Sequence, residues 1–181
     1  MTSSDKTKRK KAAAPGGAGV ATPEEARGHG LRVAIACGRF NDLISEKLRD
    51  GARSELVGRG VDPLSITEVW VPGAFELPLM AKRLAQTGEI DAVVCLGAVI
   101  RGETGHYDFV AGQCAAGIQA AQLETGVPMA FGVLTVENDQ QALDRAGGVQ
   151  GNKGAEAAAA VLEMVDLLRK FPAARASAGR G

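Results

Sequence analysis

Short apolar runs alternate with longer amphipathic patterns along most of the chain. The apolar runs are typical of buried strands and cover residues 32–37, 66–71, 92–100 and 129–135. The patterns between and after them predict helices over residues 42–59, 77–86, 107–124, 138–146 and 154–170. Because helices and strands alternate, we expect parallel strands joined by crossover helices.

The internal patterns of these segments extend this expectation to a fold class. Residues 92–100 are apolar throughout, as expected for a strand covered on both faces. Two of the predicted helices carry apolar stripes at helical spacing. These stripes consist of Val110, Cys114, Ile118 and Ala121, and of Ala158, Leu162, Val165 and Leu168. The sequence therefore predicts a three-layer, flavodoxin-like α/β fold, an open sheet of four parallel strands with helices on both faces.

The two ends of the chain have a different composition from its middle. Residues 1–30 contain Ala, Pro, Gly, Ser and charged residues but almost no large apolar side chains, and residues 172–181 are similar. Such segments cannot bury enough apolar surface to offset the entropy lost on ordering. We therefore expect disordered tails over residues 1–30 and 172–181, and one domain over residues 31–171.

Charge is balanced over the whole chain, which has 21 basic and 21 acidic side chains and a net charge of zero. Since this balance gives no general attraction to nucleic acid or to an anionic membrane, we predict neither partner. Residues 1–30 hold six basic and three acidic side chains. The segment Lys6–Lys11 is either a weak nucleic-acid arm or, as we favour, a solvated part of the tail.

The three cysteines, Cys37, Cys95 and Cys114, lie in apolar segments and show no C-x-x-C spacing. This pattern is typical of reduced core thiols rather than of disulfides or metal ligands. No apolar run reaches the roughly 18 residues of a membrane-spanning helix, and the first residues lack the apolar segment of a secretory signal. We therefore predict a cytoplasmic protein.

Candidate chemistry is expected at the carboxyl ends of the strands, because open parallel sheets bind ligands there. Four loops occupy these positions: residues 38–41, 71–76, 101–106 and 136–145. The chain has only five Phe, one Trp and one Tyr, yet Phe40 and Phe75 both lie in these loops. Each ring either stacks on a flat heteroaromatic ligand or folds back to close the end of the core.

The loop Gly102-Glu103-Thr104-Gly105 lies between a predicted strand and a predicted helix. Glycines let the backbone approach a ligand, and the free N–H groups at a helix start favour an anion such as phosphate. The alternative is an ordinary tight turn with Thr104 as the helix N-cap. The loop is neither a Walker A sequence nor G-x-G-x-x-G, so it does not specifically indicate a nucleotide.

His106 is one of two histidines and stands at the start of the helix that follows this loop. The positive end of the helix disfavours an imidazolium, so we expect a neutral ring that can take or give a proton. The alternative is an inert surface histidine, which is how we interpret His29 in the tail.

A glycine-rich connection, residues 147–154, joins the last two predicted helices. It either brings Arg145 and Lys153 to an anion or merely breaks the helix. The sequence shows no paired acids, no Ser–His pairing and no second histidine beside it. Metal-dependent and acyl-transfer chemistry therefore have no support, and we predict no metal and no organic cofactor.

Several motifs in these loops occur in a fixed order along the chain. They are Arg39–Asn41, Val71–Pro78, Gly97–Asp108, Phe131–Thr135, Arg145–Gly147 and Gly151–Gly154. Together they resemble the 6,7-dimethyl-8-ribityllumazine synthase family. The resemblance implies condensation of 5-amino-6-(D-ribitylamino)uracil with 3,4-dihydroxy-2-butanone 4-phosphate, with release of phosphate and water and without a cofactor. This reaction is the penultimate step of riboflavin biosynthesis.

The resemblance also implies a role for each matching residue. Phe40 stacks on the pyrimidine, Ala74, Phe75 and Glu76 hold the ribityl chain, and Ala98, Val99 and Ile100 border the pyrimidine. Glu103 and Thr104 cradle the phosphate, and His106 moves protons. A neighbouring subunit supplies Phe131, Lys153 and Arg145, the last of which binds the phosphate. Glu103 and Gly105 depart from the usual pattern. Because a carboxylate repels phosphate, we expect the Glu103 side chain to point to solvent and only its N–H to serve the ligand.

The implied assembly is a homo-oligomer built from pentamers, with active sites between subunits. Pentamers, decamers and sixty-subunit shells stay open, although the uninterrupted segment from Arg145 to Gly154 resembles that of shell-forming members. Two alternatives use the same fold: a flavin- or riboflavin-binding module, and a purely structural shell protein. A phospho-acceptor receiver domain is disfavoured, because Asp42 lacks the acidic cluster that such a site needs.

Overall fold

The computed structural model describes residues 28–172, and the predicted tails lie outside this range except at residues 28–30 and 172. The strands are β1 (Val33–Gly38), β2 (Ile66–Val71), β3 (Ala92–Ile100), β4 (Met129–Val136), β5 (Ala146–Gly148) and β6 (Gly151–Asn152). The α-helices are α1 (Asp42–Gly58), α2 (Leu77–Gln86), α3 (His106–Thr125), α4 (Asp139–Arg145) and α5 (Lys153–Lys170). Short 3₁₀ helices η1 (Pro63–Ser65) and η2 (Ala74–Glu76) precede β2 and α2.

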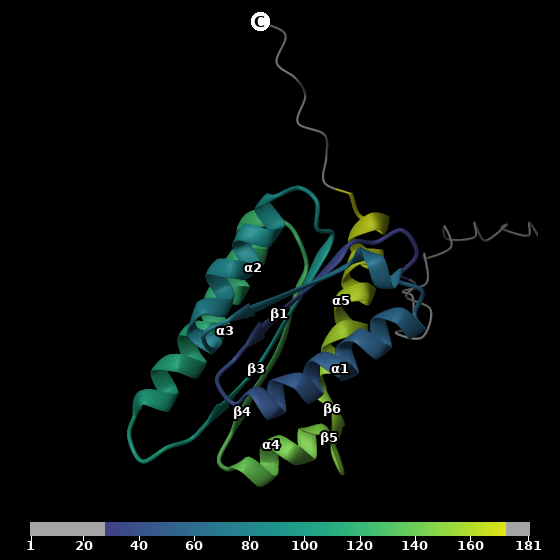
Figure 1. Ribbon diagram of the computed structural model, residues 1–181. Coiled ribbons are helices and arrows are strands. Elements are labelled where there is room, and N and C mark those ends of the chain that lie inside the picture. The colour runs from purple at the N-terminus through teal and green to yellow at the C-terminus, as the bar shows by residue number, and fades with distance from the viewer. Residues whose placement is uncertain (1–27, 173–181) are drawn as a thin grey trace, which may run out of the picture.

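The four long strands form one parallel sheet in the order β2-β1-β3-β4. Helices α2 and α3 cover one face and α1 and α5 the other (Figure 1), which confirms the predicted three-layer, flavodoxin-like fold. The chain runs outward from β1 to β2 and then returns to place β3 on the other side of β1. The crevice at such a reversal, between the carboxyl ends of β1 and β3, is where open α/β sheets bind ligands.

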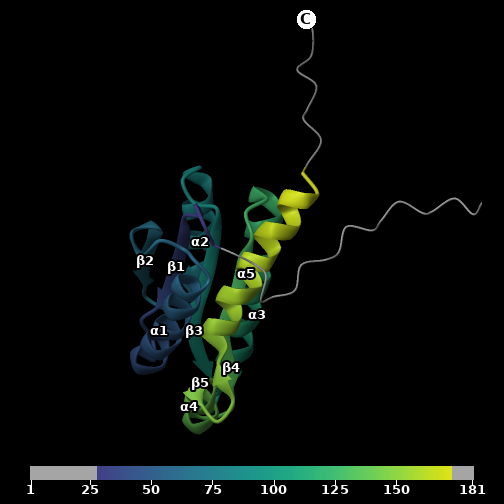
Figure 2. The ribbon, with the colours of Figure 1, turned by 90° about the vertical axis from the view of Figure 1, so that its right-hand side faces the viewer.

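The core consists of two layers, because neighbouring residues of a strand face opposite sides of the sheet. Val33, Ile35 and Cys37 of β1 pack against α1 and α5, whereas Ala34 and Ala36 pack against α2 and α3. The view onto α1 and α5 shows α4 and β5 beyond the carboxyl end of the sheet (Figure 2). Among the described helices, none combines the length and apolarity needed to cross a membrane.

The three cysteines are buried and free, as the prediction of core thiols requires. Burial is the main cause that raises the pKa of the Cys37 thiol to about 12, and burial likewise raises the pKa of Cys95 and of Cys114. Because the thiolate is the reactive form, these groups are poor nucleophiles at neutral pH.

Some predictions need correction. The apolar pattern places Leu168 on the buried stripe of the last helix, but this residue is 44% exposed. On the stripe of α3, Val110 is half-buried but packs against the core. The connection after α4 is not a plain loop, because β5 and β6 pair antiparallel within it. At the other end, Gly28 is buried and its N–H donates to Arg59 O at 2.7 Å, so the packed structure includes residues before 31.

Two glycines of α3 give a matched test of how α2 and α3 pack. A methyl group at Gly117 would lie 2.7 and 2.8 Å from ring carbons of Pro78, whereas one at Gly112 would meet nothing within 4 Å. We expect Gly117→Ala to lower Tm, because overpacking costs about 1–3 kcal/mol. Gly112→Ala should raise Tm slightly, since Ala is favoured over Gly in a helix by about 1 kcal/mol. Thermal unfolding measures both, and equal shifts would contradict the packing.

Candidate active site

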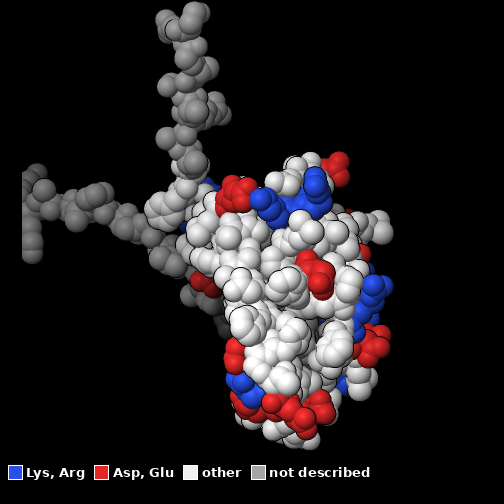
Figure 3. Space-filling model, turned by 90° about the vertical axis from the view of Figure 1, so that its left-hand side faces the viewer, with Lys and Arg blue, Asp and Glu red and all other residues white. Residues whose placement is uncertain are grey.

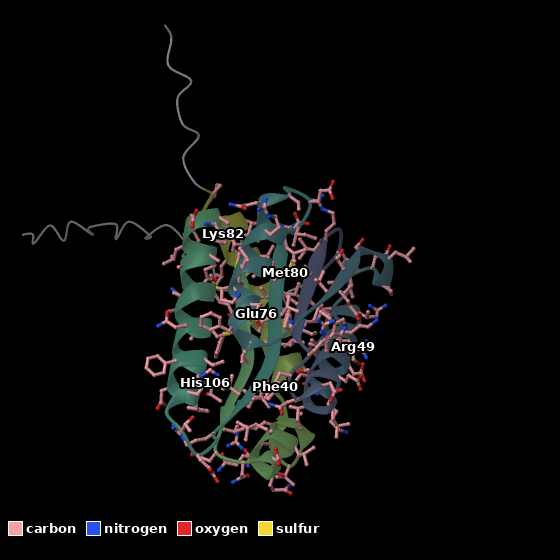
Figure 4. All side chains as sticks on the ribbon, turned by 60° about the vertical axis from the view of Figure 1, so that its left-hand side comes forward. Phe40, Arg49, Glu76, Met80, Lys82 and His106 are labelled. Carbon is pink, nitrogen blue, oxygen red and sulfur yellow. The ribbon has the colours of Figure 1, made fainter. Side chains whose placement is uncertain are left out.

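A pocket of about 460 Å³ opens at the carboxyl end of the sheet. It lies at the predicted crevice, and its walls come from the loops after β1, β2 and β3, the end of β3 and the first turns of α3. The lining residues are Phe40, Pro72, Gly73, Ala74, Phe75, Glu76, Ala98, Val99, Ile100, Gly102, Thr104, His106, Tyr107 and Val110. In Figure 4, Phe40 and His106 lie at a similar level near this end of the sheet, with Glu76 above them.

The loop after β1 is held in place by Asn41. This residue has a left-handed backbone conformation with φ 63°, and its side-chain N–H donates to Ala98 O at 3.1 Å. The backbone N–H groups of Arg39 and Phe40 donate to Val71 O and Pro72 O. Phe40 is thereby fixed at the rim with its ring 73% exposed. The ring therefore lines the pocket instead of closing the end of the core.

The loop after β2 packs directly against the first loop. A methyl group at Gly38 would lie 3.2 Å from Gly73 C and 3.3 Å from Ala74 N, so a larger residue would push the two backbones slightly apart. The short helix η2 follows, with Ala74 buried and Phe75 58% exposed. This turn places Ala74, Phe75 and Glu76 on one wall of the pocket.

The loop after β3 supplies Thr104 and His106. Gly105 is the N-cap of α3, and the Thr104 hydroxyl oxygen accepts only a long 3.4 Å hydrogen bond from the His106 N–H. The alternative prediction that Thr104 is the N-cap is therefore wrong. Glu103 is exposed and does not line the pocket, which agrees with the expectation that its carboxylate points to solvent.

Besides Glu103, three predicted site residues do not line this pocket: Phe131, Arg145 and Lys153. Phe131 lies on the edge strand β4 and is 42% exposed. The Arg145 guanidinium donates to Gln141 O at 3.1 Å, and the Lys153 ammonium pairs with Glu156 at 2.7 Å. A single chain thus brings together nine of the predicted residues and leaves these three, with Glu103, outside.

Sequence analysis missed five lining residues, of which Tyr107 and Val110 are the most informative. The sequence pattern assigns Val110 to the buried stripe of its helix, because it repeats at helical spacing with Cys114. Val110 and Tyr107 do pack against this core layer, but both are only partly buried and also line the pocket. The position of Tyr107 next to His106 was the signal that could have found it.

The pocket combines exposed aromatic rings with a few polar groups: the Glu76 carboxylate, the Thr104 hydroxyl and the His106 imidazole. The N–H groups of Gly102, Glu103 and Thr104 have no hydrogen-bond partner within residues 28–172. In the same residues, no group of three or more His, Cys, Asp or Glu side chains is placed to hold a metal ion. The site is suited to a flat ring, a polar chain and an anion.

Comparison with known proteins decides the family. A model of the family described as 6,7-dimethyl-8-ribityllumazine synthase matches residues 30–169. The chain belongs to this family. Two relatives with this name, from two strains of Thermus thermophilus, are each 55% identical to it over 139 residues. The matched region is 77% of this chain and 88% of each relative.

Membership in the lumazine synthase family confirms the resemblance found in the sequence. It makes the chain an enzyme, a transferase that acts at the condensation step of riboflavin biosynthesis. The alternatives of a flavin-binding module and a purely structural shell protein are not favoured. Small-molecule substrates and an oligomeric assembly follow from the same membership.

Two substitutions at Asn41 test whether its backbone conformation and its hydrogen bond to Ala98 O stabilise the first loop. Asn41→Gly removes the hydrogen bond to Ala98 O but permits φ 63°. Asn41→Ala removes the same bond and also forces Ala into a left-handed conformation, which costs about 1–2 kcal/mol more. We expect both variants to lower Tm, and Ala to lower it further than Gly. Equal losses in thermal unfolding would show that the backbone conformation at residue 41 does not matter.

Proposed function

We propose that this pocket is where 5-amino-6-(D-ribitylamino)uracil condenses with 3,4-dihydroxy-2-butanone 4-phosphate to give 6,7-dimethyl-8-ribityllumazine. The supporting observation is the convergence of Phe40, Glu76, Thr104 and His106 in one cavity, although they come from three separate loops. The cavity volume of about 460 Å³ lies within the usual range for small-molecule sites.

The uracil ring stacks on Phe40 in this proposal. Stacking a flat heteroaromatic partner on an exposed phenyl ring lowers the free energy of binding, because both surfaces then leave water. Ala98, Val99 and Ile100 border the ring, because the end of β3 forms the adjacent wall. The ribityl chain lies along Ala74, Phe75 and Glu76, where backbone groups and the Glu76 carboxylate can bond its hydroxyl groups.

The phosphate of the second substrate lies at the loop after β3. The three unpaired N–H groups of this loop and the Thr104 hydroxyl are hydrogen-bond donors. They stand at the start of α3, a helix of 20 residues whose positive end favours an anion. Glu103 contributes its N–H, and its exposed carboxylate stays in solvent.

His106 moves protons between the two substrates. The 5-amino group attacks the ketone carbonyl and a first water leaves, phosphate is then eliminated to give a second carbonyl, and the ribitylamino nitrogen attacks that carbonyl and expels a second water to close the ring. Each step transfers protons that a positioned imidazole can accept and return. Holding both reactants in one pocket can by itself lower the barrier by about 7–11 kcal/mol.

The active assembly is a homo-oligomer of pentamers in which each site is completed by Phe131, Arg145 and Lys153 of a neighbouring subunit. These residues lie outside the chain's own pocket, and Leu79, Phe109 and Leu123 of α2 and α3 are each at least 70% exposed in the single chain. Charged residues gather toward the two ends of the α2–α3 side, with few in its middle (Figure 3). We place the enzyme in the cytoplasm, where buried cysteines stay reduced.

The activity is tested directly by mixing the purified protein with both substrates and following lumazine fluorescence in the presence of a chelator. We expect turnover that the chelator does not reduce. A protein that binds a yellow flavin-like chromophore but makes no lumazine would contradict the proposal.

Removing the imidazole tests the proton-transfer role. We expect His106→Ala to slow turnover by roughly 10²–10⁴-fold, the usual contribution of a general acid–base group. Assembly should be intact, because the His106 side chain is exposed and packs in neither core layer. Unchanged turnover in steady-state kinetics would remove His106 from the mechanism.

Mixed assemblies test whether sites lie between subunits. His106→Ala and Arg145→Ala should each inactivate the enzyme alone. If the two are co-expressed in equal amounts and mix at random, about a quarter of the sites combine an intact His106 with an intact Arg145 from the next subunit. We expect a corresponding recovery of activity. Mixed particles, identified by mass spectrometry, that stay inactive would show that one chain supplies both residues.

A further inference from the structure

Arg101 connects three elements beside the pocket. It directly follows β3, and its backbone N–H donates to Val136 O at 2.9 Å. Its guanidinium bonds the Asp108 carboxylate in the first turn of α3 at 3.2 Å and the Glu137 carboxylate after β4 at 3.0 Å. The same group stacks on the Tyr107 ring, 4.0 Å from its centroid. One side chain thus ties the end of β3 to the start of α3 and the end of β4.

The loop between Arg101 and Tyr107 has few other restraints. Added methyl groups at Gly102 and Gly105 would meet nothing within 4 Å, so neither backbone position is packed. Among the described residues, the hydrogen bonds inside this loop are the long one from His106 N–H to Thr104 and one from Asp108 N–H to Gly105 O at 3.2 Å. Because Arg101 pairs with Asp108, it closes the base of the loop that carries Thr104 and His106.

Arg101 is not itself placed to bind a phosphate. Its side chain does not line the pocket, and two carboxylates already occupy its guanidinium. The hydrogen bonds that this group donates to Asp108 and Glu137 raise its pKa, so it stays charged and paired. The group of Arg101, Asp108 and Glu137 has a formal charge of −1, which gives no general attraction to an anion.

We propose that Arg101 is a positioning residue for the phosphorylated substrate: it holds the loop of residues 102–106 and the Tyr107 wall in the geometry that receives the phosphate. This inference rests on the proposed function, because it takes that loop as the phosphate site. The uracil site is held differently, through Phe40, Asn41 and the η2 turn. Loss of Arg101 should therefore affect the two substrates unequally.

The test measures KM for each substrate with the other at saturation. For Arg101→Ala we expect KM for the phosphorylated ketone to rise about ten- to a hundredfold, since a misplacement of about 1 Å can cost that much. KM for the uracil should stay close to the wild-type value. Calorimetry with inorganic phosphate gives a readout independent of turnover, and its Kd should rise by a similar factor.

Arg101→Lys distinguishes the positioning role of Arg101 from a direct effect of its positive charge on the phosphate. Lysine keeps a positive charge but lacks the planar fork that bridges two carboxylates. We expect this variant to resemble Arg101→Ala. Full rescue by lysine would overturn the proposal, because the charge alone would then be what the phosphate needs.

Arg32→Ala is the matched control. Arg32 forms a similar exposed ion pair with Asp91 at 3.2 Å, but it precedes β1, at the opposite end of the strands from the pocket. We expect both KM values and the phosphate Kd to stay unchanged. Equal changes in both substrates' KM for Arg101→Ala, or a loss of assembly and Tm that Arg32→Ala shares, would overturn the positioning role.

Variants of the two partners of Arg101 complete the test. Asp108→Asn and Glu137→Gln keep the side-chain shape and remove one partner's charge each. We expect each to weaken phosphate binding less than Arg101→Ala and to add nothing when combined with it. Additive effects would overturn the proposal. Wild-type protein that makes no lumazine would instead contradict the proposed function, so the two failures are distinguishable.

Discussion

The burial of β1 and β3 on both faces is the constraint on which the rest of the structure depends. Their side chains alternate between two core layers, so a shift of one residue would exchange the layers and place each strand's residues against the wrong helices. Parallel strands fixed in this way end together at one edge of the sheet. The loops that follow them must meet there, and the crevice between β1 and β3 receives residues from positions as far apart as Phe40 and His106.

The loops at this edge combine close backbone contact with open space. Gly38 lets the first two loops touch, and the hydrogen bond from Asn41 to Ala98 O ties the first loop to the end of β3. The third loop has no such packing, and the N–H groups of Gly102, Glu103 and Thr104 are left unpaired within the described residues. A rigid stacking wall thus faces a loop with free donors. This arrangement suits a planar reactant on one side and an anionic one on the other.

The sequence predicted those elements that depend on local apolar pattern and missed those that depend on contacts between distant residues. The four strands and the main helices were predictable because apolar periodicity depends on burial alone. The site loops were predictable because the carboxyl ends of parallel strands lie at one edge of the sheet. Leu168 was misplaced, since a periodic pattern does not show where a helix extends beyond the sheet it covers. The pattern placed Val110 against the core but did not show that it also lines the pocket. The β5–β6 hairpin has too few residues for a pattern. The Arg101 bridge joins residues 7 and 36 positions away, and only the fold brings them together.

The electrostatics of the pocket explain why one chain is expected to be incomplete. Its lining contains one carboxylate, Glu76, and no Lys or Arg. A phosphate monoester carries a charge of about −1.5 to −2 at neutral pH. The helix start of α3 supplies only about half a positive charge, so a guanidinium is needed nearby to balance the rest. Arg101 is already paired with two carboxylates, and Arg145 lies outside this pocket. In the proposed assembly, Arg145 of a second subunit supplies this cation, so that assembly serves the chemistry as well as stability.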